Sequence, residues 1–312
     1  MKIEIKKNRI ILLITLMFSI LNHIKAQPNY PSDPQQAIFI YSDLENFKEA
    51  YDHLNAGVDT IQILNTFYFE KASVGLREYI GKHKLTPEML KKAIVNNKEK
   101  YDQISSFIDG LTLFKQRYSE TMQKYKEVIP DAMFPPTYLL VGANRGIGQG
   151  SRYGQLVTIT KVLDNEELLL KLIVHELSHF QQARVQGFEN YIALYSSPNN
   201  MLGLCLREGG AEFITSMVLQ DITKAKALKY LNENEKELKN RFKEDLLTQN
   251  QKFWLWESLN QNKYPNLLGY VMGLKINQSF YENSIDKDKA LHVILKSTNP
   301  EDILKKSGYL TN

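Results

Sequence analysis

Three residues of one short segment have the types and the spacing of a metal site. His175, Glu176 and His179 form the pattern H-E-x-x-H. On an α-helix, positions i and i+4 lie on one face, so both imidazoles can bind the same ion. The glutamate between them can then act as a general base on a metal-bound water. The pattern therefore predicts a zinc centre that hydrolyses peptide bonds, and it requires a third protein ligand.

A pair of glutamates further along the chain can supply that ligand. The metzincin pattern, which places a further His after the second one, is absent because Phe180-Gln181-Gln182-Ala183-Arg184 follows His179. Glu208 and Glu212 are spaced i and i+4, so they share one helix face. We expect Glu208 to bind zinc and Glu212 to accept a hydrogen bond from a ligand imidazole. Glu212 as the ligand, or an ordinary surface pair of glutamates, are the alternatives.

Two adjacent glycines separate these glutamates. Gly209 and Gly210 each cost a helix interior about 1 kcal/mol relative to alanine. Close approach of two helix backbones is a reason to tolerate both. The pair therefore predicts that the helix carrying Glu208 crosses closely against the helix carrying the two histidines.

Peptide hydrolysis also requires a donor that stabilises the oxyanion. Tyr270, which lies between two glycines in Gly269-Tyr270-Val271-Met272-Gly273, is the candidate. A core aromatic is the alternative interpretation of Tyr270. His292 and Arg152 are further candidates for the same role.

The elements around these residues define how they are positioned. The apolar run Leu168–Val174 precedes His175 and predicts a buried helix, opened by Asn165 and ending near Gly187. A second helix from Met201 to about Leu219 carries the glutamate pair. Between the N-terminal half and these helices, Thr137–Val141 and Gln155–Thr160 have strand composition.

The segment 142–154 between the two strand candidates is rich in glycine. A phosphate-binding loop is excluded because no P-loop lysine follows and the next element is a strand. We expect the two strands to form a hairpin that borders the cleft and holds an extended substrate by strand addition.

The remainder of the chain has a helical pattern. The first predicted helix begins with Ile38 and Ile40, and the second runs from about Thr60 to His83. A third helix begins at Thr86-Pro87 and is expected to break near Asp109-Gly110. A charged helix is predicted from Thr223 to Leu246. The predicted fold class is mainly α with a small β-hairpin or sheet (α+β) around a zincin-like metallopeptidase core. The expected organisation is a signal peptide over 1–26, an N-terminal helical region over 27–132 and a metallopeptidase domain over 133–312.

The N-terminal segment has the pattern of a secretory signal. A basic stretch that ends at Arg9 precedes the apolar run Ile10–Leu21, which is shorter than the roughly 20 residues of a membrane span. We expect cleavage after Ala26 and a periplasmic or extracellular protein of the cell envelope. An uncleaved anchor, the one expected route to membrane contact, is the alternative. The single cysteine, Cys205, permits no internal disulfide and is expected to be buried.

Charge and composition limit the possible partners. The chain has 312 residues with 39 basic and 35 acidic side chains, and its formal net charge is +4. This balance is mild and spread along the chain, so nucleic acid is not an expected partner. The expected partner is a peptide or protein substrate, and the expected cofactor is Zn²⁺.

Four segments together resemble a known family. These are His175–Gln182, Glu208–Phe213, Leu268–Ile276 and Ser307–Tyr309. They are similar to a bacterial family of zinc-dependent proteases that is gluzincin-like and largely of unknown function, over roughly residues 133–309. The resemblance implies His175, His179 and Glu208 as zinc ligands and Glu176 as the general base.

A gliding-motility lipoprotein resembles the same family. It carries a lipid-modified cysteine after its signal, whereas no cysteine directly follows the signal region here, so the chain departs from that protein at this point. Independently of this departure, the alternative function is a non-catalytic envelope or gliding-related protein with a structural or vestigial metal site.

Overall fold

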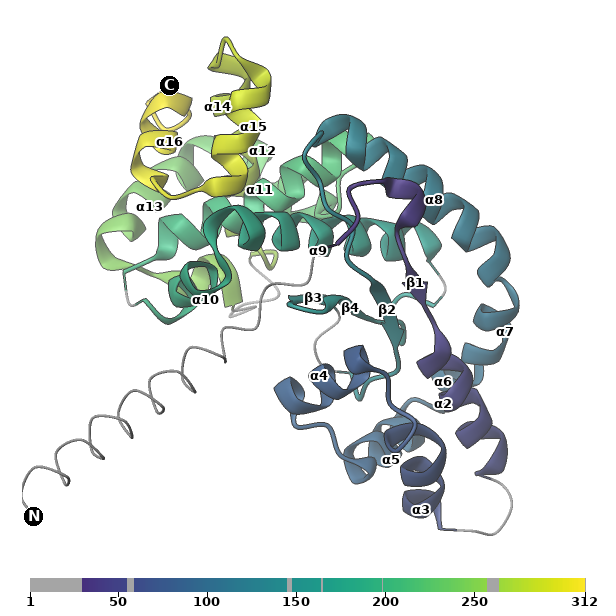
Figure 1. The fold of residues 1–312 in the computed structure, drawn as a ribbon. Coiled ribbons are helices and arrows are strands. Elements are labelled where there is room, and N and C mark those ends of the chain that lie inside the picture. Colours follow the sequence, from purple (N-terminus) through teal and green to yellow (C-terminus); the bar gives the residue numbers. More distant parts are fainter. Residues whose placement is uncertain are drawn as a thin grey trace, which may run out of the picture.

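The computed structural model describes residues 30–54, 59–144, 148–163, 165–197, 199–256 and 264–311. This part of the chain is mainly helical and contains a small four-stranded sheet, as Figure 1 shows. The predicted fold class, mainly α with a small sheet, is confirmed at this level. The predicted signal peptide over 1–26 lies outside the described residues. No helix within those residues has the length and apolar character needed to cross a membrane.

The strands are β1 (Phe39–Ile40), β2 (Thr137–Leu140), β3 (Gly148–Ser151) and β4 (Gly154–Thr158). The N-terminal helices are α2 (Ser42–His53), α3 (Thr60–Leu64), α4 (Val74–His83), α5 (Pro87–Asn96), α6 (Lys98–Asp102), α7 (Ile104–Asp109) and α8 (Leu111–Val128). The later helices are α9 (Glu166–Gln186), α10 (Phe188–Ser196), α11 (Met201–Leu219), α12 (Ala225–Glu233), α13 (Glu235–Thr248), α14 (Leu268–Asn283), α15 (Lys287–Lys296) and α16 (Pro300–Ser307). Three short 3₁₀ or π segments are η1 (Pro34–Gln36), η2 (Asn65–Phe69) and η3 (Lys252–Trp256).

The sheet has the strand order β1-β2-β4-β3, and its topology corrects one prediction. β2 and β4 are parallel, with Thr137 opposite Gln155, so they do not form the expected hairpin. The hairpin is instead β3–β4, which pair antiparallel. Gly154 opens β4 at a φ of +136°, and a Cβ there would lie 1.9 Å from the carbonyl oxygen of Pro136. The chain can enter β4 beside the start of β2 only because this residue is glycine.

The expected helix starting at Ile38 and Ile40 is also wrong. Phe39–Ile40 forms β1, which pairs in parallel with Thr137–Tyr138, and α2 starts later, at Ser42. The amide of Thr137 donates to the carbonyl oxygen of Ile38 at 2.8 Å. Tertiary pairing therefore satisfies the backbone of this apolar run as a strand.

Three predicted helical stretches are divided in the structure. The stretch that begins at Thr86-Pro87 breaks at Asn97 and Gln103 as well as at the expected Asp109-Gly110. The stretch 60–83 breaks at Ala72–Ser73, where the Ser73 hydroxyl accepts a hydrogen bond from the Leu76 amide and caps α4. The stretch 223–246 breaks at Asn234 into α12 and α13. The predicted limits of the helix carrying the two histidines are confirmed, since the Asn165 side chain caps α9 and Gly187 follows its last residue.

The helix carrying Glu208 lies between two others. α11 packs against both α9 and α14. The closest backbone approach is to α14, because a Cβ on Gly209 would lie 2.1 Å from the carbonyl carbon of Gly273. The prediction that Gly209 serves the crossing with the histidine helix is therefore wrong, whereas Gly210 does face Gln182 of α9, together with Ile294.

Candidate metal centre

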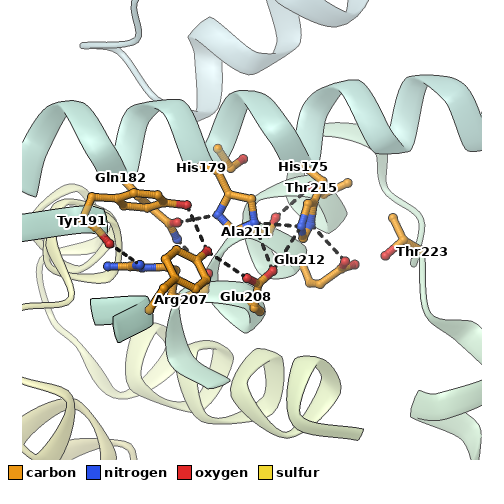
Figure 2. Close-up of polar contacts among 12 residues, drawn as sticks. His175, His179, Gln182, Tyr191, Arg207, Glu208, Ala211, Glu212, Thr215 and Thr223 are labelled. Atoms are coloured by element: carbon orange, nitrogen blue, oxygen red, sulfur yellow. Dashed lines mark hydrogen bonds and ion pairs between the residues drawn. The ribbon is translucent and has the colours of Figure 1, made fainter. Parts of the chain in front are cut away.

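Two helices bring three potential ligand atoms together. Nε2 of His179 lies 3.0 Å from Nε2 of His175 and 3.0 Å from Oε2 of Glu208. Nε2 of His175 lies 3.5 Å from the same oxygen. α9 supplies both histidines and α11 supplies the glutamate, and Figure 2 shows the three side chains converging between the helices. The three residues are buried and form a group that could hold a metal ion.

Each imidazole has an acceptor at its other nitrogen. Nδ1 of His179 lies 2.8 Å from Oε1 of Gln182, and Nδ1 of His175 lies 3.0 Å from Oε1 of Glu212. A carboxylate or amide oxygen only accepts hydrogen bonds, so both Nδ1 atoms are assigned the proton. Both Nε2 lone pairs then face the centre, as a metal site requires. Gln182 also donates to the carbonyl oxygen of Arg207 at 2.8 Å, which links α9 to α11.

A lysine pairs with the glutamate behind His175. Nζ of Lys224 lies 3.0 Å from Oε1 of Glu212, a carboxylate that is 1% exposed. Burial alone would raise the pKa of Glu212, but His175 and Lys224 outweigh it and hold this pKa below its ordinary value. Burial alone would lower the pKa of His175, but Glu212 and Glu208 raise it to about 10, so metal binding would have to displace a second imidazole proton from Nε2.

Glu208 is oriented by residues of α10, a helix that was not predicted from the sequence. The Tyr195 hydroxyl donates to Oε1 of Glu208 at 3.2 Å, which leaves Oε2 facing the histidines. The Arg207 guanidinium lies 3.9 Å from the ring centroid of Tyr191 and 4.8 Å from that of Tyr195. Burial would raise the pKa of Glu208, but His179 and His175 hold it well below the ordinary value. The apolar residues Phe188, Tyr191, Ile192 and Tyr195, spaced i, i+3, i+4 and i+7, are the pattern that could have predicted α10.

Tyr270, the expected oxyanion donor, is close to this centre. Its ring is nearly parallel to that of His175, at an interplanar angle of 15° and a centroid distance of 6.1 Å. Burial, followed by the charge of Glu208, raises the pKa of Tyr270 well above its ordinary value, so the phenol keeps its proton. The other two candidates lie exposed, His292 on α15 and Arg152 at the turn between β3 and β4.

Glu176 faces the hairpin. A Cβ on Gly148 of β3 would lie 2.6 Å from Oε1 of Glu176, whereas a Cβ on Gly150 would meet His179 only at 3.9 Å. Burial raises the pKa of Glu176 above its ordinary value, against the opposing effect of His179 and His175. A general base is most effective when its pKa lies near the operating pH, so a raised pKa brings Glu176 closer to that condition at neutral pH.

The donor set fits a tetrahedral zinc ion. Zinc bonds of about 2.0–2.1 Å at tetrahedral angles separate the ligand atoms by roughly 3.3 Å. The separations of 3.0, 3.0 and 3.5 Å lie around that value. Two imidazole nitrogens and one carboxylate oxygen are also ligand types that zinc prefers.

Comparisons with known proteins add no family to this description. No family model matches the chain, and neither the curated proteins nor the solved structures contain a match.

Proposed function

We propose that the protein is a zinc-dependent peptidase with a zincin-like core. The convergence of His175, His179 and Glu208, with Glu176 on the same helix, is the observation that carries the proposal. A structural zinc site has no need of a general base, whereas a hydrolytic site requires one. The resemblance of the four sequence segments to zinc-dependent proteases supports the same conclusion.

The residues have distinct roles in this proposal. His175, His179 and Glu208 hold the zinc, and Glu212 and Gln182 fix the histidine tautomers. Zinc, when bound, supplies Lewis acidity toward the scissile carbonyl and lowers the pKa of a bound water to about 7. Glu176 accepts a proton from the attacking water and delivers it to the leaving amine nitrogen. The Tyr270 hydroxyl donates a hydrogen bond to the developing oxyanion.

The substrate chain is proposed to lie along β3. This strand is at the end of the sheet order, next to Glu176. The amide of Gln155 donates to Pro136 on the β2 side, so Gly150, its partner in β3, directs its own backbone groups outward. An extended peptide can pair with such an edge. Lys82 donates to the Gly150 carbonyl oxygen at 3.2 Å, so the peptide replaces one existing contact.

The expected location follows from the N-terminal segment. The basic stretch and the apolar run that follows it favour export, so the substrate is proposed to be a peptide or protein of the cell envelope.

One observation favours a second candidate function, a metal site without catalysis. His175, Glu176, His179 and Glu208 are only 4–6% exposed. A buried ion that only joins α9 to α11 needs no access for a substrate, and this low exposure fits such an ion. Under this alternative the protein is an envelope or gliding-related protein with a structural or vestigial metal.

Metal content and turnover together test the proposal. Wild type should hold one zinc per chain, and His175→Ala and Glu208→Ala should hold almost none. Wild type should cleave members of a mixed peptide library, and Glu176→Ala should retain zinc but lose at least about 10²-fold in rate. Wild type without bound zinc would refute the metal site. Equal products with and without Glu176 would refute the mechanism and favour the second function.

A further inference from the structure

An apolar strip links the segment before β1 to α9 and α10. Its members are Tyr30, Phe180, Phe188, Ile192 and Tyr195. The rings of Tyr30 and Phe180 meet edge to face with centroids 5.6 Å apart, and those of Phe180 and Phe188 do so at 6.3 Å. These ring contacts join Tyr30, which precedes β1, to Phe180 of α9 and Phe188, the first residue of α10.

Both ends of the strip are attached to parts of the proposed site. The Tyr30 hydroxyl donates to the carbonyl oxygen of Arg152 at 2.7 Å, in the turn between β3 and β4. The Tyr195 hydroxyl donates to Glu208 at the other end. These two contacts place the ends of the strip at the β3–β4 turn and at the metal centre, the two parts of the site that the proposed peptide would span.

The strip is poorly covered over α10, whereas Phe180 is buried. α10 contains no buried residue, and its only charged side chain is Glu189. Phe188, Ile192 and Tyr195 share one face of α10 at i, i+4 and i+7. Ile192 is 59% exposed and Tyr195 is 41% exposed. An exposed apolar surface that adjoins a candidate site is typical of a surface that binds a ligand.

We propose that the apolar strip binds a large apolar side chain of the substrate peptide, next to the bond that is cut, and that Ile192 determines this preference. The inference rests on the proposed function and specifies its substrate class. Ile192 is the most exposed member and makes no polar contact that would be lost with it. Burying its side chain against an apolar residue removes apolar area from water, which stabilises the complex.

Peptide binding in the absence of turnover tests the inference. The full chain carrying Glu176→Ala, loaded with zinc, is titrated into fluorescein-labelled decapeptides of Gly, Ser and Ala. One series carries a single Phe at each central position in turn, and the reference peptide carries Gly instead. We expect the best Phe peptide to bind about tenfold more tightly than the Gly peptide. Ile192→Ser in this background should remove most of that difference, and Ile192→Leu should retain it.

Ile285→Ser is the matched control, because Ile285 is fully exposed in the loop between α14 and α15, outside the strip. Equal binding of Phe and Gly peptides by the parent, or no loss in Ile192→Ser, would overturn the inference. An equal loss in Ile285→Ser would do the same. If the Glu176→Ala chain binds the Phe peptide through Ile192 but wild type cleaves no peptide, the proposed hydrolysis fails and the strip remains. Hydrolysis by wild type without any apolar preference would refute the strip alone.

Discussion

At the scale of single residues, two tyrosines from different helices interact with Glu208, and Tyr270 also lies against a histidine of the candidate centre. Tyr195 of α10 donates to the carboxylate oxygen that faces away from the histidines. Tyr270 of α14 lies against the ring of His175. A hydroxyl that orients a ligand should affect metal affinity, whereas one that stabilises an oxyanion should affect turnover.

Tyr270→Phe tests the second role. Removing the hydroxyl should lower kcat by about 10²-fold, because one oxyanion donor contributes on that order, while KM and zinc content stay near wild type. Steady-state kinetics on a peptide cleaved by wild type measure this. A kcat within about threefold of wild type would return Tyr270 to the role of a core aromatic.

Tyr195→Phe tests the first role. We expect the zinc affinity to fall by about tenfold, the lower end of the range for residues that orient metal ligands. Competition with a chromophoric chelator measures the Kd. Tyr191→Phe is the control, since the Tyr191 hydroxyl contacts that of Tyr195 at 3.3 Å, whereas within the described residues it is the Tyr195 hydroxyl of this pair that bonds to Glu208. Equal losses in both variants would indicate a general loosening of α10 instead.

A site residue could be predicted from the sequence when its partner lies within one helical turn of it along the chain. Two glutamates one helical turn apart identified Glu208 and Glu212, because the spacing fixes the shared face. Tyr195 and Lys224 could not be identified, since their contacts with these glutamates depend on how α10 and the start of α12 fold back over α11. Seventeen tyrosines offer no local feature that separates one from the others.

At the scale of elements, β3 packs closely against α9 because two of its residues, Gly148 and Gly150, have no side chain. Gly148 lies against Glu176 and Leu172, and Gly150 lies against His179. The hairpin can therefore approach the helix closely at Glu176, the proposed general base. This close approach predicts different outcomes for two identical substitutions.

Gly148→Ala should displace the Glu176 carboxylate, because its Cβ would lie 2.6 Å from Oε1 and 2.8 Å from Cδ1 of Leu172. We expect turnover to fall by about 10²-fold, as for small misplacements of catalytic groups, with zinc content unchanged. Gly150→Ala is the control, since its nearest contacts are at ordinary distances of 3.9 and 4.0 Å. Similar losses in both variants, or none in Gly148→Ala, would contradict this arrangement.

The joint between α2 and α4 predicts a pH dependence. Asp43 is fully buried, and its Oδ1 accepts the Ser73 amide at 2.9 Å. Burial raises the pKa of Asp43, against the opposing contacts with Ser73 and Arg77. A folded-state pKa above the unfolded value means that the folded protein loses stability as the pH rises through the range between them. The loss is about 1.4 kcal/mol when the two pKa values differ by one.

Denaturant unfolding of wild type and Asp43→Asn between pH 4 and 7 isolates this group. The free energy of unfolding of wild type, minus that of the variant, should decrease as the pH rises, because an asparagine at this position has no charge to bury. A difference that stays constant or increases over this interval would show that the Ser73 and Arg77 contacts dominate.

The elements themselves were predictable to different degrees. The limits of α9 and the start of α5 followed from local signals, the Asn165 cap, Gly187 and Thr86-Pro87. The pairing of β2 with β4 did not, since the strand composition of both runs is the same in a parallel and an antiparallel pair. β1 was missed because its two residues form a strand by pairing with β2, a contact that the local sequence does not reveal.

At the scale of the whole molecule, the N-terminal helical region and the proposed metallopeptidase domain share buried polar contacts. The Tyr68 hydroxyl donates to the carbonyl oxygen of Val141 at 2.7 Å and accepts the Val141 amide at 3.0 Å. The Tyr101 hydroxyl donates to the carbonyl oxygen of Gly142 at 2.8 Å. Figure 1 shows these N-terminal helices around the sheet. They fix the end of β2, from which the chain continues toward β3 and the site.

A chain restricted to residues 133–312 should therefore fail to fold by itself. It would lack β1, and the backbone groups of Val141 and Gly142 would lose buried partners at about 1–3 kcal/mol each. Circular dichroism with thermal unfolding should show no cooperative transition, and zinc content should be well below one per chain. The chain 30–312 is the matched control and should unfold cooperatively with one zinc bound. A cooperative transition and full zinc content in 133–312 would instead establish it as an independent domain, with the N-terminal helices serving another purpose.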